Sequence, residues 1–504
     1  MNNPSRRHFL EGAAATIAGA AVLSSGTAEA AAKKGSKGTA AYDLIIVGAG
    51  CGGLVCAVRA AQIGLKTLLL EKMMDSSGNT IYAAGFMLGT NTKMQRAAGI
   101  SGDTTDKFYD DMIKVSKGHG DPALTRYFVD HADQTLEWMA DYCGIKFKTG
   151  MHFIFPMLTR SHLVQGPTQP GGSQLALDLQ KKAKSLGVKM MFNTKVVQLL
   201  QNSKGVVDGV RVKTKDGYSD IRSRGGVVLA TGGFSANQAM VTQYAGAAAA
   251  RMPIRGSRII AGENIKLTDP LFAKFVNVDQ YHCGPIHGPT GANPLNIVNN
   301  GICVSKDGTE RFTDEGQTYV QMARDTAAKT SDNWAFMIVD EDVHNLKVLA
   351  SDWKSYAKNH APVYKADTIE ALAKEAGLDP KKLTKIVDEY NEACANNTRA
   401  KLVPPNTLKV ARPVKKAPFY AVPFQGGMTA TFGGPLVNTD AQVLDTENQP
   451  IPGLYAIGNA AGGLFYDNYV GGAQLTNAAV YGYHVADYIK AHLKMLKFGL
   501  SEPN

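Results

Sequence analysis

A glycine-rich turn directly after a short apolar run is the feature that most constrains the fold of this chain. The run Leu44-Ile45-Ile46 leads into Val47-Gly48-Ala49-Gly50-Cys51-Gly52-Gly53. In a strand–turn–helix unit of this kind, the first glycine permits the tight turn, the second lets the backbone approach a pyrophosphate, and the third lets helix and strand pack closely. Amides at the start of the helix then face the phosphates, where the helix dipole favours negative charge. The pattern predicts a dinucleotide-binding βαβ unit.

An acidic residue in register with this turn strengthens the prediction. A second predicted strand covers residues 67–70 and ends at Glu71, 18 residues after Gly53. An acid at this point accepts hydrogen bonds from a ribose hydroxyl. The alternative is a glycine-rich helix cap that binds nothing, but such a cap would not need an acid there. Strand, turn, helix, strand and acid together indicate an α/β protein with a Rossmann-like domain.

Length and charge set the outer bounds. At 504 residues the chain is long enough for two to four domains. Its formal net charge of +10 is spread along the sequence, and no basic stripe with interleaved aromatic residues accompanies it. We therefore expect solubility and attraction to acidic partners, and no nucleic-acid partner.

The N-terminal thirty residues are predicted to be a targeting segment. Ser5-Arg6-Arg7-His8-Phe9-Leu10 is a twin-arginine pattern, a mild apolar run follows it, and Ala28-Glu29-Ala30 fits a small-x-small cleavage site. This predicts a twin-arginine signal peptide at 1–30, a linker at 31–41, a periplasmic mature protein and no integral membrane segment in the mature chain. A cytosolic protein with a chance double arginine is the alternative.

The six cysteines argue against metal, haem and disulfide chemistry. They are scattered without metal-ligand spacing, and no Cys-x-x-Cys-His motif is present. We predict no metal site, no covalently attached haem and no disulfide framework.

Further segments rich in glycine and other small residues occur later in the chain, two of them after predicted strands. They are Gly78-Asn79-Thr80 with Ala84-Gly85, then Ala230-Thr231-Gly232-Gly233-Phe234, and Gly453-Leu454-Tyr455-Ala456-Ile457-Gly458 with Gly471-Gly472. In this joint order the chain resembles the FAD-dependent family of fumarate reductase flavoproteins, urocanate reductases and 3-ketosteroid dehydrogenases. The resemblance implies bound FAD, a discontinuous Rossmann-like FAD domain at 42–276 and 432–495, an inserted α+β capping domain at 277–431, and a tail at 496–504.

The resemblance also implies which residues hold the flavin. Residue 459 is Asn where many members carry Glu, so one ribose contact is altered. The implied cofactor-binding residues are Gly48, Gly50, Cys51, Gly52, Gly53, Glu71, Lys72, Asn79, Thr80, Ala84, Gly85, Val197, Ala230, Thr231, Gly232, Gly458, Asn459, Ala473 and Leu475.

The implied substrate site departs from that of fumarate reductase. The family histidine is retained as His282. The proton-donating arginine lies eight residues after an Arg-Phe pair, and here that position is Tyr319. The second carboxylate-binding arginine, before the Gly-Gly of the last helix, is replaced by Tyr469. A further histidine becomes Ala430, and the Glu-x-x-Arg proton relay falls on Leu295 and Val298.

These losses predict a change of substrate. Burying a carboxylate without its partner costs several kcal/mol, so a site without both arginines should not hold fumarate. Tyrosines at 319 and 469 resemble the ketosteroid and enone-reducing branch. The resemblance implies catalytic roles for Tyr319, Tyr469, His282 and Gly472: hydride passes from FAD N5 to the β-carbon, Tyr319 protonates the α-carbon, and Tyr469 with an amide near Gly472 or Ala473 holds the carbonyl oxygen of an enone or enoate.

Three alternatives stay open at this point. The chain could run the reverse reaction as a 3-ketosteroid-type dehydrogenase, or it could bind flavin without catalysis. Either tyrosine could be a hydrogen-bonded core residue. Because no haem motif is present, an ene-reductase in anaerobic respiration would need a separate electron donor such as a c-type cytochrome.

Further expectations concern local structure. A helix is predicted over 263–275, and Tyr466 is either a third site tyrosine or a core residue. Phe153, Phe155 and Met157 either line an apolar substrate pocket or pack as a hydrophobic loop.

Overall fold

The computed structural model describes residues 42–76, 78–153 and 156–498. The predicted signal peptide at 1–30, the linker at 31–41 and residues 499–504 of the predicted tail lie outside these ranges.

A six-stranded sheet forms the centre of the nucleotide-binding part, in the order β18-β19-β10-β1-β2-β6. Five strands run parallel, and only the edge strand β18 is antiparallel to its neighbour. Both faces of β1 and β2 are buried, which explains the apolar runs at 44–47 and 68–70. The strands are β1 (Leu44–Val47), β2 (Thr67–Leu70), β6 (Lys189–Met191), β10 (Val227–Leu229), β18 (Gln442–Leu444) and β19 (Pro450–Ala456).

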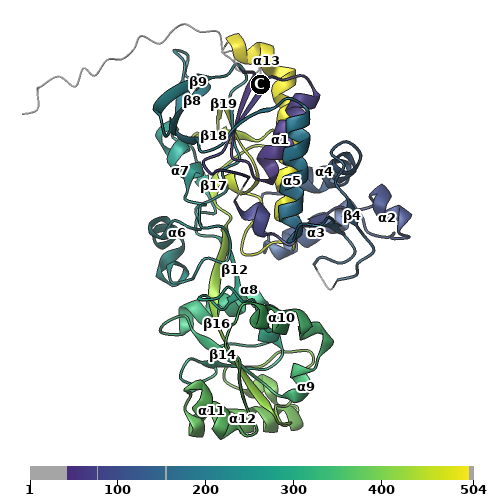
Figure 1. Ribbon diagram of the computed structural model, residues 1–504, viewed down its shortest axis with the longest axis vertical. Coiled ribbons are helices and arrows are strands. Elements are labelled where there is room, and N and C mark those ends of the chain that lie inside the picture. The colour runs from purple at the N-terminus through teal and green to yellow at the C-terminus, as the bar shows by residue number, and fades with distance from the viewer. Residues whose placement is uncertain (1–41, 77, 154–155, 499–504) are drawn as a thin grey trace, which may run out of the picture. The chain divides into compact units, whose positions relative to one another are not determined.

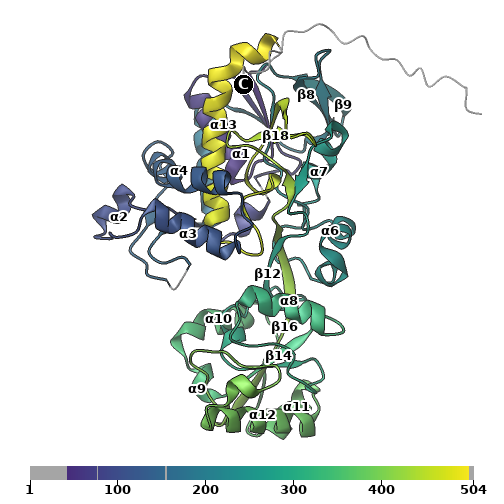
Figure 2. The same ribbon diagram turned by 180° about the vertical axis from the view of Figure 1, so that it is seen from behind.

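Three helices lie side by side against this sheet: α1 (Cys51–Gln62), α5 (Gly171–Ser185) and α13 (Ala473–Phe498) (Figures 1 and 2). Small residues let α1 and α13 approach closely, since a Cβ on Gly482 would lie 2.5 Å from the carbonyl oxygen of Gly52. A three-stranded sheet of β7 (Lys195–Gln201), β8 (Val207–Thr214) and β9 (Gly217–Arg222) contacts β10 and β19 through β8.

A second, five-stranded sheet carries the middle of the chain. Its order is β12-β16-β14-β13, with β15 also paired to β16, and every pairing is antiparallel. Two apolar clusters cover its faces. The elements are β12 (Tyr281–Ile286), β13 (Ile302–Ser305), β14 (Ala335–Val339), β15 (Tyr364–Ala366), β16 (Phe419–Thr431), α8 (Tyr319–Lys329), α9 (Glu341–His344), α10 (Ala350–Lys358), α11 (Ile369–Ala376) and α12 (Pro380–Ala395).

The chain enters and leaves this second sheet at one place. Strand β11 (Phe275–Val276) pairs antiparallel with β17 (Gly434–Pro435), just outside β12 and β16. The remaining elements are α2 (Lys93–Ala97), α3 (Thr105–Val115), α4 (Pro122–Asp141), α6 (Gln238–Ala250), β3 (Phe86–Leu88), β4 (Phe147–Lys148) and β5 (Ser161–Val164).

The predicted helix over 263–275 is wrong in its extent. Helix α7 covers only Glu263–Thr268, a single 3-10 turn follows at Asp269–Leu271, and β11 begins at Phe275. Pro270 explains the early stop, because it lacks an amide hydrogen and its ring clashes with the preceding helical turn.

All six cysteines are free thiols. Among the residues that the structure describes, no group of three or more His, Cys, Asp and Glu side chains could hold a metal ion. In the same part of the chain no helix is long and apolar enough to cross a membrane.

Candidate active site

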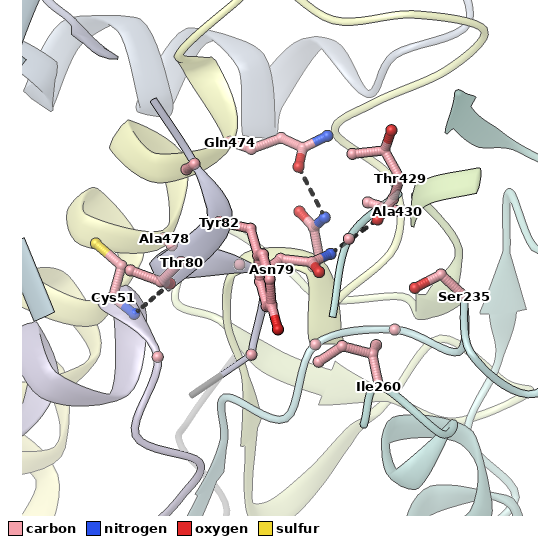
Figure 3. A pocket seen from close by; sticks show the side chains of 18 of the residues that line it. Cys51, Asn79, Thr80, Tyr82, Ser235, Ile260, Thr429, Ala430, Gln474 and Ala478 are labelled. Atoms are coloured by element: carbon pink, nitrogen blue, oxygen red, sulfur yellow. Dashed lines mark hydrogen bonds between the residues drawn. The ribbon is translucent and has the colours of Figure 1, made fainter. Parts of the chain in front are cut away.

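A cavity of about 620 Å³ opens at the carboxyl ends of the parallel strands. Its walls include the ends of β1, β2 and β10, the first turn of α1, the start of α13, and residues of β12 and β16. Ligands of open α/β sheets bind at this edge. Figure 3 shows Cys51 and Thr80 on one wall, with Ser235 and Ile260 across from them.

Glycine shapes the nucleotide end of the cavity. Gly48 has φ of +110°, and a Cβ there would lie 2.5 Å from the carbonyl oxygen of Ala230. A Cβ on Gly53 would lie only 1.9 Å from the oxygen of Gly48. Gly50 begins α1 without any side-chain cap. The turn therefore exposes backbone rather than side chains, which is the surface that a pyrophosphate requires.

The side chains of the 78–80 motif fix this turn. Thr80 accepts a hydrogen bond at its Oγ1 from the Cys51 amide at 3.0 Å (Figure 3). Asn79 accepts from the Ser257 amide at 2.7 Å and donates to the Thr429 carbonyl at 3.0 Å. The motif thus links the first nucleotide-binding unit to segments about 180 and 350 residues further along the chain.

Charged side chains also line the cavity, next to the end of β2. Glu71 lines the cavity at the end of β2, and its two oxygens accept from the amides of Ala49 and Met73, both at 2.9 Å. Lys72 forms an ion pair with Glu263 at 2.7 Å. These bonds fix the Glu71 carboxylate at the cavity wall, and its contact with a ribose stays a prediction.

The cavity also contains polar atoms that are suited to a polar ligand. Ser235 Oγ, Gln474 Nε2 and Glu263 Oε2 are buried without a hydrogen-bond partner in the described part of the chain, and all three residues line the cavity. Buried polar atoms of this kind are uncommon in folded proteins. Together with the glycine cradle, they fit a dinucleotide.

Most of the predicted site residues meet in this cavity. The lining includes Gly48, Gly50, Cys51, Gly52, Glu71, Lys72, Asn79, Thr80, Ala84, Gly85, Ala230, Thr231, Gly232, His282, Tyr319, Gly458, Asn459, Tyr469, Gly472 and Leu475.

Three predicted cofactor residues do not line it. Gly53 serves the contact between α1 and β1, as its missing Cβ shows. Val197 is 37% exposed at a β-bulge, whereas its neighbour Val196 faces the cavity. Ala473 is fully buried and its amide donates to the Val470 carbonyl at 2.8 Å. That amide is therefore engaged within the helix start, which leaves Gly472 as the lining residue there.

Three ring-bearing side chains form the other end of the cavity. The Tyr319 hydroxyl lies 3.4 Å from His282 Nε2. The ring of Tyr469 meets the His282 ring edge-to-face, with centroids 4.7 Å apart. Tyr319 is the first residue of α8, Tyr469 precedes α13, and His282 lies on β12. Segments that are far apart in the sequence thus bring two phenols into contact with one imidazole.

Burial sets the protonation of this group. It lowers the pKa of His282 to about 3, with the positive charges of Arg255 and Arg324 adding to the effect. Burial also raises the pKa of Tyr319 and, more strongly, that of Tyr469, although Arg255 opposes both shifts. Near neutral pH the imidazole is therefore neutral and both phenols carry their protons.

One arginine ties the three supporting segments together. Arg324, on α8, forms an ion pair with Asp467 at 2.6 Å and also donates to the carbonyl of that residue. Its other bond goes to the Tyr281 carbonyl at 2.9 Å. Each of these partners lies one or two residues from a cavity side chain, so Arg324 fixes the spacing of Tyr319, His282 and Tyr469.

Arg255 lines the cavity and was not predicted from the sequence. Its backbone amide donates to the Met428 carbonyl at 2.7 Å, and its Nη1 donates to Thr429 Oγ1 at 3.1 Å. It stands in the segment between α6 and α7, where no motif marks it. The only available signal was a charged residue beside Gly256 shortly before the predicted helix at Glu263.

The apolar segment at 153–157 only partly lines the cavity. Met157 lines the cavity and lies 3.0 Å from where a Cβ on Gly471 would stand. Phe153 does not line it and packs edge-to-face on Phe86, with centroids 5.5 Å apart. Phe155 lies outside the described residues. Tyr466 is absent from the lining and packs against His119 instead, with centroids 4.5 Å apart and the rings tilted by 37°.

The chain belongs to the family whose model is described as an FAD binding domain, which matches residues 43–475. The NADH:fumarate oxidoreductase of Klebsiella pneumoniae is 29% identical over 472 residues, covering 92% of this chain and 49% of that protein. The chain therefore spans about half the length of that relative. The urocanate reductase of Eggerthella lenta is 28% identical over 462 residues, covering 88% of this chain and 74% of its own length.

Solved structures agree in fold. The open conformation of a flavocytochrome c3 fumarate reductase superposes with a TM-score of 0.77 at 25% identity, covering 98% of this chain and 82% of that one. The 3-ketosteroid delta1-dehydrogenase of Sterolibacterium denitrificans gives 0.74 at 21% identity, covering 89% and 99%. The predicted fold class and the predicted cofactor, FAD, are both confirmed.

Proposed function

We propose that this flavoprotein reduces a C=C bond conjugated to a carbonyl group. The observation that carries the proposal is the group of two phenols around a buried imidazole, at the end of the cavity away from the glycine cradle. Relatives named for fumarate and urocanate reduction act on C=C bonds of this kind.

Each side chain has a distinct role in this proposal. When bound, FAD would supply the hydride for the β-carbon of the substrate. Tyr319 gives its proton to the α-carbon, and its raised pKa keeps that proton available at neutral pH. Tyr469 donates a hydrogen bond to the carbonyl oxygen, where negative charge develops. Neutral His282 holds the Tyr319 hydroxyl in place.

The same protonation argues against the dehydrogenase alternative. To remove a proton from a saturated ketone, Tyr319 would have to act as a base, which requires a tyrosinate. Burial raises its pKa and so disfavours the tyrosinate. The fold likeness to a ketosteroid dehydrogenase does not outweigh this, because the two chains share only 21% of their residues.

The setting of the reaction is part of the proposal. We place residues 277–431 as a capping domain on a discontinuous FAD domain. The twin-arginine pattern at Arg6-Arg7 supports export to the periplasm. There a separate electron-donor protein, such as a c-type cytochrome, would reduce the flavin during anaerobic respiration.

Turnover of the purified holoprotein tests the reaction. Reduced methyl viologen should be oxidised when conjugated enones or enoates are added, and the saturated product should accumulate in equal amount. Reduction of an artificial dye by saturated ketones, without viologen oxidation, would instead identify a dehydrogenase. Activity in neither assay would overturn both functions.

A further inference from the structure

Arg255 is a cationic side chain at the cavity wall whose described partners are all neutral. Its guanidinium packs over Gly284 of β12, where a Cβ would come within 3.0 Å of Cζ and Nη1. The absence of a side chain at Gly284 therefore makes room for the guanidinium. Because successive residues of a strand point to opposite faces, residues 282, 284 and 286 share one face of β12. His282 and Ile286 on that face both line the cavity. This places the guanidinium about two residues along the strand from the imidazole.

The hydrogen bonds of Arg255 leave its charge unbalanced. Nη1 donates to the Thr429 hydroxyl at 3.1 Å. The side-chain amide of Asn293 satisfies its neighbours when its oxygen and nitrogen are exchanged. In that orientation the Asn293 oxygen accepts from Arg255 Nη2 at 3.3 Å, and the Asn293 nitrogen donates to the Pro285 carbonyl at 3.2 Å. Neither Thr429 nor Asn293 is acidic, and among the described residues Arg255 forms no ion pair. A guanidinium has five donors in a planar fork that matches a carboxylate.

Other charged residues of the cavity do not offer such a site. Lys72 is paired with Glu263, and Lys195 lies 3.8 Å from the same carboxylate. Both stand at the nucleotide end. The charge of Arg255, in contrast, acts on the side chains of His282, Tyr319 and Tyr469. The apolar Leu295 and Ile286 also line the cavity.

We propose that Arg255 binds a carboxylate of the substrate, so that the enzyme prefers unsaturated monocarboxylates over neutral enones. This inference rests on the proposed reduction of a conjugated C=C bond and adds the charge of its substrate. One guanidinium balances one carboxylate. A dicarboxylate such as fumarate would leave its second charge buried without a partner, which is unfavourable.

Pairs of acids and methyl esters provide the test. We would assay the holoprotein with a series of 2-enoates, including 3-phenylprop-2-enoate, each alongside its methyl ester. Because a hydrogen bond to a charged group is worth about ten- to a hundred-fold in affinity, Arg255→Gln should lower kcat/KM for the acids by about that factor. The esters should change by less than about three-fold. An equal loss for acid and ester would overturn the proposal.

Two further variants separate charge from folding. Arg258→Gln removes the same charge from an exposed side chain three residues away that does not line the cavity, and it should leave both substrates unaffected. Arg255→Lys keeps the charge without the fork and should lose less activity on acids than Arg255→Gln. All variants should retain bound FAD. An acid-specific loss in Arg258→Gln as large as that in Arg255→Gln would contradict a role for Arg255.

A binding measurement distinguishes this inference from the proposed reaction. Titration of the oxidised holoprotein with saturated 3-phenylpropanoate should change the flavin absorbance, with Kd about ten- to a hundred-fold higher in Arg255→Gln. Such binding without alkene turnover would sustain the carboxylate site and refute the reductase. If the enzyme reduces neutral enones and Arg255→Gln binds 3-phenylpropanoate as tightly as the wild type, the carboxylate site is refuted and the reductase activity stands.

Discussion

The two ends of the cavity are built from different materials. At the nucleotide end, glycines at 48, 50 and 232 line the cavity with backbone, and a Cβ at Gly48 would clash with the Ala230 carbonyl oxygen. At the other end, side chains form the surface, and His282, Tyr319 and Tyr469 come from three separate segments. The contrast teaches that one end recognises a ligand shared across a family, whereas the other can be altered one side chain at a time.

The largest expected effect tests the backbone end. Gly48→Ala should lose most bound FAD and about 2–5 kcal/mol of stability, because it combines a strained φ with a Cβ 2.5 Å from the Ala230 oxygen. Flavin absorbance per protein and urea unfolding measure both. Gly64→Ala is the matched control, since Gly64 also has positive φ but has nothing within 4 Å of its Cβ position. Equal losses in the two variants would show that the close contact is unimportant.

The next effect belongs to the side-chain end. Tyr319→Phe should keep bound FAD and lose about 10²- to 10⁴-fold in kcat, the usual contribution of a general acid. Viologen oxidation with an enoate measures it. Tyr218→Phe, which alters an exposed phenol on β9, serves as the control. An unchanged rate in Tyr319→Phe would remove this residue from the mechanism.

Tyr469 should matter somewhat less. Tyr469→Phe removes one donor to the carbonyl oxygen and should cost about 10²- to 10³-fold in kcat, with bound FAD retained. Tyr466→Phe changes a phenol in the same loop that packs against His119 outside the cavity, and its rate should stay near that of the wild type. Similar rates in the two variants would show that lining the cavity does not distinguish Tyr469 from Tyr466 in function.

The smallest effect is a response to acid at the side-chain end. The folded pKa of His282 is about 3, whereas an unfolded histidine titrates near 6.5. Between these values only the unfolded chain takes up the proton, so the free energy of unfolding is unaffected above pH 6.5 and falls as the pH falls below it.

Urea unfolding at pH 7 and pH 4.5 should show this response. The wild type should lose about 2.5 kcal/mol more on acidification than His282→Gln, because pH 4.5 lies two units below the unfolded pKa and above the folded one. Turnover should show no histidine-type change between pH 7 and 9, because both tyrosines have raised pKa values. Equal acid sensitivity of the two proteins would mean that His282 is not held neutral.

The contrast between the two ends also explains what the sequence could predict. The backbone end follows from local order: Gly48, Gly50 and Glu71 lie within one βαβ unit, so their spacing along the chain fixes their spacing in the structure. The predicted helix over 263–275 was wrong in its extent because Pro270 ends it after Thr268. The arrangement within the βαβ unit can be predicted because residues that are close in sequence there are also close in space.

The side-chain end depended on resemblance and was only partly found. Tyr319 and Tyr469 were identified from their positions relative to family motifs, and the cavity contains both. Arg255 was not predicted because its position depends on contacts with residues far away in the sequence. Its backbone amide donates to the Met428 carbonyl, and its side chain lies over Gly284. Nothing adjacent to Arg255 in the sequence announces either neighbour. The two family arginines are replaced at positions 319 and 469, as the resemblance implies, and Arg255 is a different arginine that lines the cavity.

The clamp made by Arg324 has a consequence for how such enzymes diversify. It holds β12 and the 467 loop partly through the main-chain carbonyls of Tyr281 and Asp467, and every amino acid supplies a carbonyl. The scaffold spacing is thus independent of which residues occupy 282, 319 and 469. Mutational drift at those three positions can explore new chemistries while the frame that presents them stays in place.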